Sequence, residues 1–112
     1  MNLSIEQKGS VVLLAVHEER LDAHNSSELK NQMLKLFEEG KQNMIVDLQE
    51  VRFVDSSGLG ALVSGFKNAS SRNGCLKLSG LQLQVKSMFE LTRLHRVFEI
   101  FADVDEALAS FS

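Results

Sequence analysis

The chain has 112 residues, of which 44% are hydrophobic and 24% charged, a size and composition that predict one globular domain over residues 1–112. The formal net charge is −3 and no basic run exceeds a pair, which argues against direct binding of nucleic acid. No apolar run approaches the ~20 residues of a membrane span and the first residues lack signal-peptide character, so we expect a cytoplasmic protein without membrane insertion.

A β-hairpin is predicted at the start of the chain. Residues 3–7 alternate apolar and polar side chains, and Lys8-Gly9 offers a turn. Residues 11–16 then form a continuous apolar run with the length of a buried strand. A polar loop beginning at His17 leads through Leu21-Asp22 toward the first helix.

The first helix is predicted to begin at Asn25 and to end at Gly40. Asn25 and Glu28 have the spacing of a capping box, in which two side chains satisfy free backbone amides at a helix start. The apolar residues of this helix recur at i, i+4, i+7 and i+8, as Leu29, Met33, Leu36 and Phe37.

Strands and helices alternate over the rest of the chain. The pattern predicts a strand over residues 43–48, a strand end before residue 55, a helix to about residue 72, a strand over 75–79, a helix over 82–92, a short strand around 98–100 and a helix from 103. Such alternation implies right-handed parallel crossovers with helices packed against the sheet. We therefore expect an α/β fold with a mixed, mostly parallel sheet of about five strands and about four helices.

The stretch from Val51 to Phe66 contains the candidate functional residues. Asp55, Ser56 and Ser57 fall at a predicted helix start, where free N–H groups and the helix dipole favour oxygen atoms and negative charge, so a phosphoryl group could be held there. Gly58 and Gly60 leave the first turn free of bulk, which would allow another molecule to approach. An ordinary capping cluster is the alternative interpretation, although one cap suffices for a helix start. The core-facing positions are predicted to be Leu59, Leu62, Val63 and Phe66.

Better-known nucleotide and hydrolase motifs are absent from this stretch. A dinucleotide fingerprint would need glycine where Val63 stands, and a Walker A loop would need Gly-Lys followed by Ser or Thr. A nucleophile elbow would need glycine two places before the serine, whereas Val54 precedes Ser56 and Asp55 precedes Ser57. We expect no catalytic residue.

The remaining titratable groups show no pattern of a site. His17, His24 and His95 fall in predicted loops, so we expect solvated histidines, although a catalytic triad with distant partners stays open. No metal-ligand spacing is convincing, and lone Cys75 fits a packed strand position. We expect neither metal nor cofactor.

Residues 53–62, Phe-Val-Asp-Ser-Ser-Gly-Leu-Gly-Ala-Leu, closely resemble the signature of the STAS domain, the sulphate-transporter and anti-sigma-factor-antagonist module of bacteria. The order of predicted elements is similar to that family over essentially the whole chain. Leu21-Asp22 also matches a family position, but Glu19 stands where the family usually has glycine, which changes the expected loop geometry.

The resemblance implies an anti-sigma factor antagonist without catalytic activity of its own. The first serine after the aspartate, Ser56 here, would be phosphorylated by a GHKL-type serine kinase that is also an anti-sigma factor. The unphosphorylated form would bind that kinase, phosphorylation would end binding, and a PP2C-type phosphatase would reset the protein. The resemblance implies partner contacts at Asp22, Asp55, Ser57, Gly58, Leu59 and Gly60.

The residues also predict two details of the site and leave two other functions open. Asp55 is expected to orient the Ser56 hydroxyl, and Ser57 to act as the cap or as a second partner contact. The alternatives are an unphosphorylated STAS accessory subunit of a transport ATPase or regulatory complex, disfavoured by the retained Ser56, and a serine hydrolase, disfavoured by the missing elbow. The protein is expected to be a monomer or weak homodimer.

Overall fold

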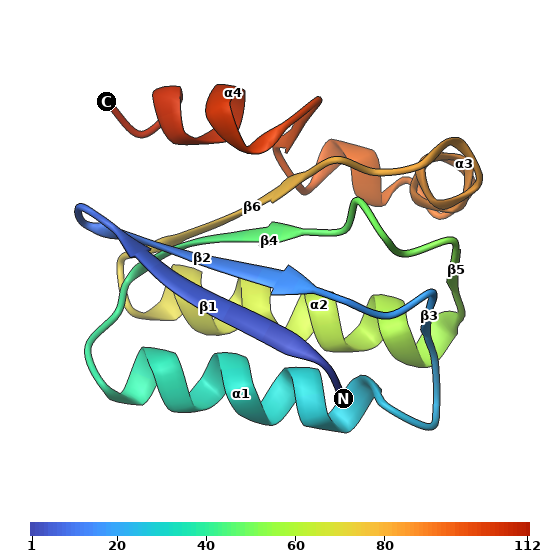
Figure 1. Cartoon of the computed structure of the whole chain (residues 1–112), viewed down its shortest axis with the longest axis horizontal. Helices are drawn as coiled ribbons and strands as arrows, with labels where there is room; N and C mark the ends of the chain where they lie inside the picture. Colours follow the sequence, from blue (N-terminus) through green and yellow to red (C-terminus); the bar gives the residue numbers. More distant parts are fainter.

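A five-stranded sheet in the order β1-β2-β4-β6-β7 forms the centre of the computed structural model, which describes all residues from 1 to 112 (Figure 1). Strand β1 is antiparallel to β2, and the other neighbours are parallel, as the sequence predicted. The elements are β1 (Leu3–Lys8), β2 (Val11–Val16), β3 (Arg20–Leu21), α1 (Ser26–Glu38), β4 (Asn43–Asp47), β5 (Phe53–Val54), α2 (Ser56–Ser71), β6 (Cys75–Ser79), α3 (Leu83–Leu91), the 3-10 helix η1 (Leu94–Arg96), β7 (Ile100–Phe101) and α4 (Val104–Ala109).

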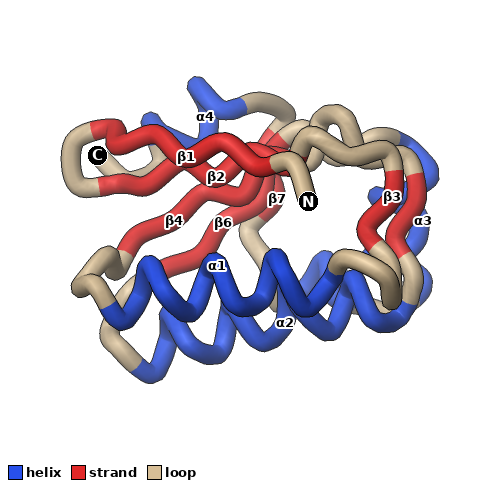
Figure 2. The backbone as a smooth tube through the Cα atoms, turned by 60° about the horizontal axis from the view of Figure 1, so that its bottom comes forward, coloured by secondary structure: helices blue, strands red, loops and turns tan.

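Helices cover both faces of the sheet. Helices α1 and α2 lie side by side on one face, and α4 lies on the opposite face (Figures 1 and 2). The two helices can approach closely because Gly65 of α2 has no side chain: a Cβ there would lie 2.7 Å from the sulfur of Met33 on α1. The alternation of strand side chains follows these layers, since Val12 and Leu14 of β2 pack toward the α1–α2 face and Val11 packs toward α4.

A buried lysine connects α4 to the sheet. Lys77, on the α4 face of β6, is only 6% exposed. Its ammonium group lies 2.8 Å from the hydroxyl of Ser110, 3.1 Å from the carboxylate of Glu99 and 4.2 Å from the centre of the Phe111 ring. These partners satisfy a charge that would otherwise be costly to bury.

The capping box predicted for α1 is wrong. Asn25 stands at the N-cap, but its side chain accepts a hydrogen bond from the Asp22 amide at 2.9 Å and donates to the Arg20 carbonyl at 2.8 Å. Glu28 instead binds the N-terminal ammonium of Met1 at 2.7 Å. The long-range ammonium contact replaces the local one because the N-terminus, where β1 begins, lies beside the start of α1 (Figure 1).

A small second sheet was not predicted. The two-residue strands β3 and β5 pair in parallel, with Arg20 opposite Phe53 and Leu21 opposite Val54. Both strands are too short to show a hydrophobic period, so only the folded chain reveals their pairing. This pair stands between the ends of the main strands and the starts of α1 and α2 (Figure 2).

The side chain of Asp47 is expected to make stability depend on pH. It lies at the end of β4, where burial, and to a smaller extent the charge of Glu50, raises the pKa of its carboxyl group above the usual value. The folded state therefore disfavours the ionised form of Asp47. The free energy of unfolding should consequently fall as pH rises from the usual pKa of an aspartate through the raised pKa of Asp47.

Asp47→Asn should consequently raise the free energy of unfolding at pH 7. The gain should shrink toward pH 3, where the wild-type carboxyl group is protonated in both states. The amide oxygen can keep the hydrogen bonds from the Gln49 amide and the Ser79 hydroxyl. Urea unfolding of both proteins at the two pH values measures the difference, and an equal effect at both would contradict this explanation.

Candidate functional site

The start of α2 is held by backbone contacts to the segment around β3. The Arg52 amide donates to the Glu19 carbonyl at 2.7 Å, and the Asp55 amide donates to the Leu21 carbonyl at 3.2 Å. The chain therefore leaves β5 in a fixed direction and turns into the helix at Ser56. The β3–α1 loop and the start of α2 lie at the same end of the molecule (Figure 1).

Ser56 and Ser57 are the first two residues of α2, and both are exposed. Their backbone amides donate no hydrogen bond within the protein, as expected in the first turn of a helix. The cap is Asp55, whose Oδ1 accepts from the Gly58 amide at 2.9 Å. The hydroxyl of Ser56 is thus not required for capping and is free to react or to contact another molecule.

The roles predicted for the side chains of Ser57 and Asp55 differ from those in the structure. Ser57 is not the cap, because Asp55 fills that role. Asp55 does not orient the Ser56 hydroxyl either: its second oxygen, Oδ2, accepts from the Ala23 amide at 3.2 Å. The carboxylate therefore links α2 to the β3–α1 loop.

Asp22 lies in that same loop, and its side chain is 13% exposed. Its Oδ1 accepts from the His24 amide at 3.0 Å, and its Oδ2 accepts from Arg20 Nε at 3.3 Å. The His24 amide, with a smaller effect of the Arg20 guanidinium, lowers the pKa of the Asp22 carboxyl group below its usual value. Asp22 is consequently ionised at neutral pH.

The glycines of the first turn have different surroundings. Gly58 is buried, and a Cβ on it would lie 2.4 Å from the Leu21 carbonyl oxygen, so the fold itself requires glycine there. Leu59 is 6% exposed and belongs to the core. Gly58 and Leu59 therefore have a role in the fold itself, and the partner contacts predicted for them stay predictions. Gly60 is exposed, and nothing lies within 4 Å of the position its Cβ would take.

A hollow of about 350 Å³ lies between the first turns of α1 and α2. Its walls are made mostly of small side chains, with the longer Lys30 contributed by α1. The lining residues are Ser26, Ser27, Lys30, Ser57, Gly60 and Ala61. Gly60 thus borders open space on the exposed side of α2.

An exposed aromatic residue also lies at this end of the molecule. Phe53 of β5 is 40% exposed, and the guanidinium of Arg20 lies 4.2 Å from its ring centre. Arg20 also pairs with Asp22. The contact between Arg20 and Phe53 depends on the register of β3 and β5, which places the two residues opposite each other and which no local sequence pattern predicts.

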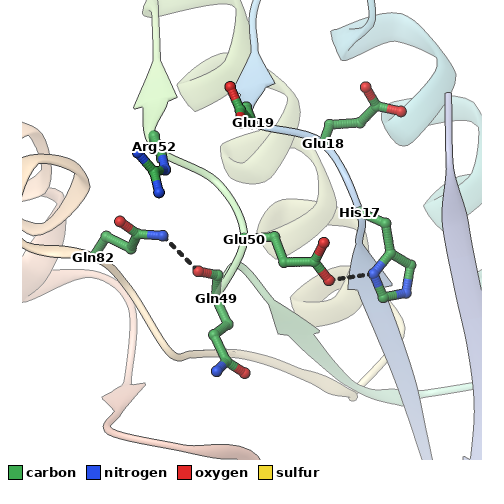
Figure 3. A pocket seen from close by; sticks show the side chains of 7 residues that line it. All are labelled: His17, Glu18, Glu19, Gln49, Glu50, Arg52 and Gln82. Atoms are coloured by element: carbon green, nitrogen blue, oxygen red, sulfur yellow. Dashed lines mark hydrogen bonds and ion pairs between the residues drawn. The ribbon is translucent and has the colours of Figure 1, made fainter.

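A polar pocket of about 360 Å³ lies beyond the ends of β2 and β4 (Figure 3). His17 was predicted to be a solvated histidine, but its ring hydrogen-bonds Ser4 at 2.8 Å and Glu50 at 2.5 Å. At the other end of the pocket, Gln82 donates to the Gln49 carbonyl at 2.7 Å. The lining residues are His17, Glu18, Glu19, Gln49, Glu50, Arg52 and Gln82.

The structure brings together no three His, Cys, Asp or Glu side chains that could hold a metal ion. No helix has both the length and the apolar character needed to cross a bilayer. The features that stand out are therefore the exposed serines, the capped helix start and the loop bound to it.

Residues 2–107 match the STAS domain family. The anti-sigma-B factor antagonist of Listeria monocytogenes is 33% identical, over 89% of this chain and 90% of that protein. The anti-sigma-B factor antagonist of Bacillus subtilis is 28% identical, over 91% of this chain and 92% of that protein. Among solved structures, the phosphorylated form of the Bacillus cell fate determinant SpoIIAA shares the fold with a TM-score of 0.77 and 18% identity, covering 99% of this chain and 100% of that chain.

The chain therefore belongs to the STAS domain family, among the anti-sigma factor antagonists. Its class is that of regulatory proteins rather than enzymes.

Proposed function

We infer that this antagonist is controlled by phosphorylation of Ser56. In its unphosphorylated form it binds and sequesters an anti-sigma factor that is also a GHKL-type serine kinase. Transfer of a phosphoryl group to Ser56 ends that binding, and a PP2C-type phosphatase restores the unmodified form. The partner surface comprises Asp22, Ser57 and Gly60 around the acceptor serine.

The observation that carries this proposal is the free hydroxyl of Ser56 at an already capped helix start. Because Asp55 caps the helix, esterification of Ser56 removes no hydrogen bond that the fold needs. The unused amides of Ser56 and Ser57 and the helix dipole favour the added charge of about −1.5 to −2. SpoIIAA, which shares this fold, has been solved in a phosphorylated form.

The surroundings of Ser56 explain why the same group would repel a partner. Asp22 is half-buried and ionised, and Asp55 is half-buried beside the serine. A partner that packs on this surface must already accommodate negative charge, and a phosphoryl group adds both bulk and further charge at its centre. The contact can then be switched without a large change of fold.

Phosphate transfer to single-serine variants tests the assignment. The protein is incubated with ATP and the candidate kinase, and phosphate is located by mass spectrometry. The wild type and the matched control Ser57→Ala should each gain one phosphate, and Ser56→Ala should gain none, because both serines are exposed but only one is the proposed acceptor.

Phosphate in Ser56→Ala would refute the site. Binding to the kinase without any transfer to the wild-type protein would favour an unphosphorylated accessory subunit. Either result leaves the family assignment intact, since that assignment rests on the sequence relationship.

A further inference from the structure

The carboxylate of Asp55 hydrogen-bonds two separate segments of the chain. Its Oδ1 accepts from the Gly58 amide at 2.9 Å within its own helix, and its Oδ2 accepts from the Ala23 amide at 3.2 Å in the β3–α1 loop. Capping α2 needs only the first bond. The second bond therefore requires an explanation of its own.

The other side-chain hydrogen bonds of this loop are local. Asn25 accepts from the Asp22 amide at 2.9 Å, and Asp22 accepts from the His24 amide at 3.0 Å. Among loop residues 22–25, only Ala23 hydrogen-bonds α2 or its cap residue. Ala23 and His24 are exposed, so little apolar burial holds the tip of the loop in place.

We propose that Asp55 is a positioning residue: it holds the β3–α1 loop against the start of α2, so that the kinase meets Asp22 and Ser56 as one preformed surface. This inference rests on the proposed function. A loop that is already ordered costs less conformational entropy when a partner binds it. Asp55 thus strengthens binding through the loop, without a direct partner contact of its own.

The variant Asp55→Ser separates the two hydrogen bonds. Serine is as good an N-cap as aspartate, so the bond to Gly58 can be kept. Its single, shorter-reaching oxygen cannot also accept from Ala23. Asp103→Ser is the matched control, because Asp103 caps α4 in the same way, accepting from the Glu106 amide at 2.9 Å, and makes no bond to another segment.

Three measurements are compared for the wild type and both variants: hydrogen exchange of the Ala23 amide by NMR, affinity for the kinase, and steady-state phosphorylation of Ser56. In Asp55→Ser, Ala23 exchange should be about tenfold faster, as expected for losing one hydrogen bond to a charged group. The Kd and the KM should rise about tenfold with kcat unchanged, because binding and not chemistry is impaired. Asp103→Ser should match the wild type in all three.

Unchanged Ala23 exchange in Asp55→Ser would overturn the inference, as would faster exchange with wild-type affinity. A fall in kcat at constant KM would also overturn it, since Asp55 would then act at the transfer step. If the wild-type protein binds no such kinase, the proposed function fails, while the exchange measurement still decides whether Asp55 holds the loop.

Discussion

Phosphorylation of Ser56 is expected to weaken binding to the kinase at least about a hundredfold, which corresponds to roughly 2.7 kcal/mol. The modified serine is exposed and directly follows Asp55, whose carboxylate is hydrogen-bonded to the β3–α1 loop. Burying a phosphoryl group in a close interface would cost both steric fit and desolvation of its charge of about −1.5 to −2. Calorimetric titration of the purified phosphorylated and unphosphorylated forms measures the ratio of the two dissociation constants.

Two variants serve as controls for this comparison. Ser56→Ala removes the acceptor hydroxyl without adding bulk or charge, so it should bind within a few fold of the wild type. Ser71→Glu adds a negative charge to an exposed position at the far end of α2 and should leave affinity unchanged. A loss of less than tenfold on phosphorylation, or a comparable loss in Ser71→Glu, would contradict a local switch.

Gly58→Ala is expected to lower the free energy of unfolding by about 2 kcal/mol, the net of overpacking and a smaller gain in helix propensity. The new Cβ would lie 2.4 Å from the carbonyl oxygen of Leu21 and 2.8 Å from Val54 Cγ1. The carbonyl cannot move freely, because it accepts the hydrogen bond from the Asp55 amide. Thermal unfolding should show a Tm lower by about 10 °C, given the size of the domain.

Gly60→Ala is the matched control, two residues along the same helix. Its Cβ meets nothing within 4 Å, so alanine should raise the free energy of unfolding by about 0.5–1 kcal/mol through helix propensity. Equal effects of the two substitutions would show that the close contact with Leu21 is not what requires glycine. The fold does not need glycine at position 60, and the open space beside Gly60 is available to the proposed partner.

The different surroundings of Gly58 and Gly60 could not be predicted from the local sequence. Both follow the serines in one helical turn, and the sequence predicted the same role for both, a first turn open to another molecule. Gly58 is buried only because β3, far away in the sequence, pairs with β5 and places the Leu21 carbonyl against α2. The β3–β5 pair is two residues long on each side, too short for any periodic signal.

The elements with a clear hydrophobic period were predicted with nearly their observed bounds. The strand over residues 11–16 and the helix that begins at Ser56 are examples, and so is the helix start at Asp103, whose carboxylate caps the Glu106 amide. Capping at Asp103 was predictable because it joins groups three residues apart. The cap at Asn25 was predicted by the same rule and failed, because Asn25 and Glu28 each found a partner outside the helix.

The sequence by itself determined the α/β architecture, the family resemblance and the position of Ser56 at a helix start, because each depends on spacings within a few residues. Only the tertiary structure decided that the Asp55 carboxylate also binds Ala23 and that Gly58 is buried. Those facts depend on which distant backbone groups the folded chain brings to the start of α2. The hydrogen bond between Ala23 and Asp55 joins residues 32 positions apart, so no local pattern of side chains predicts it.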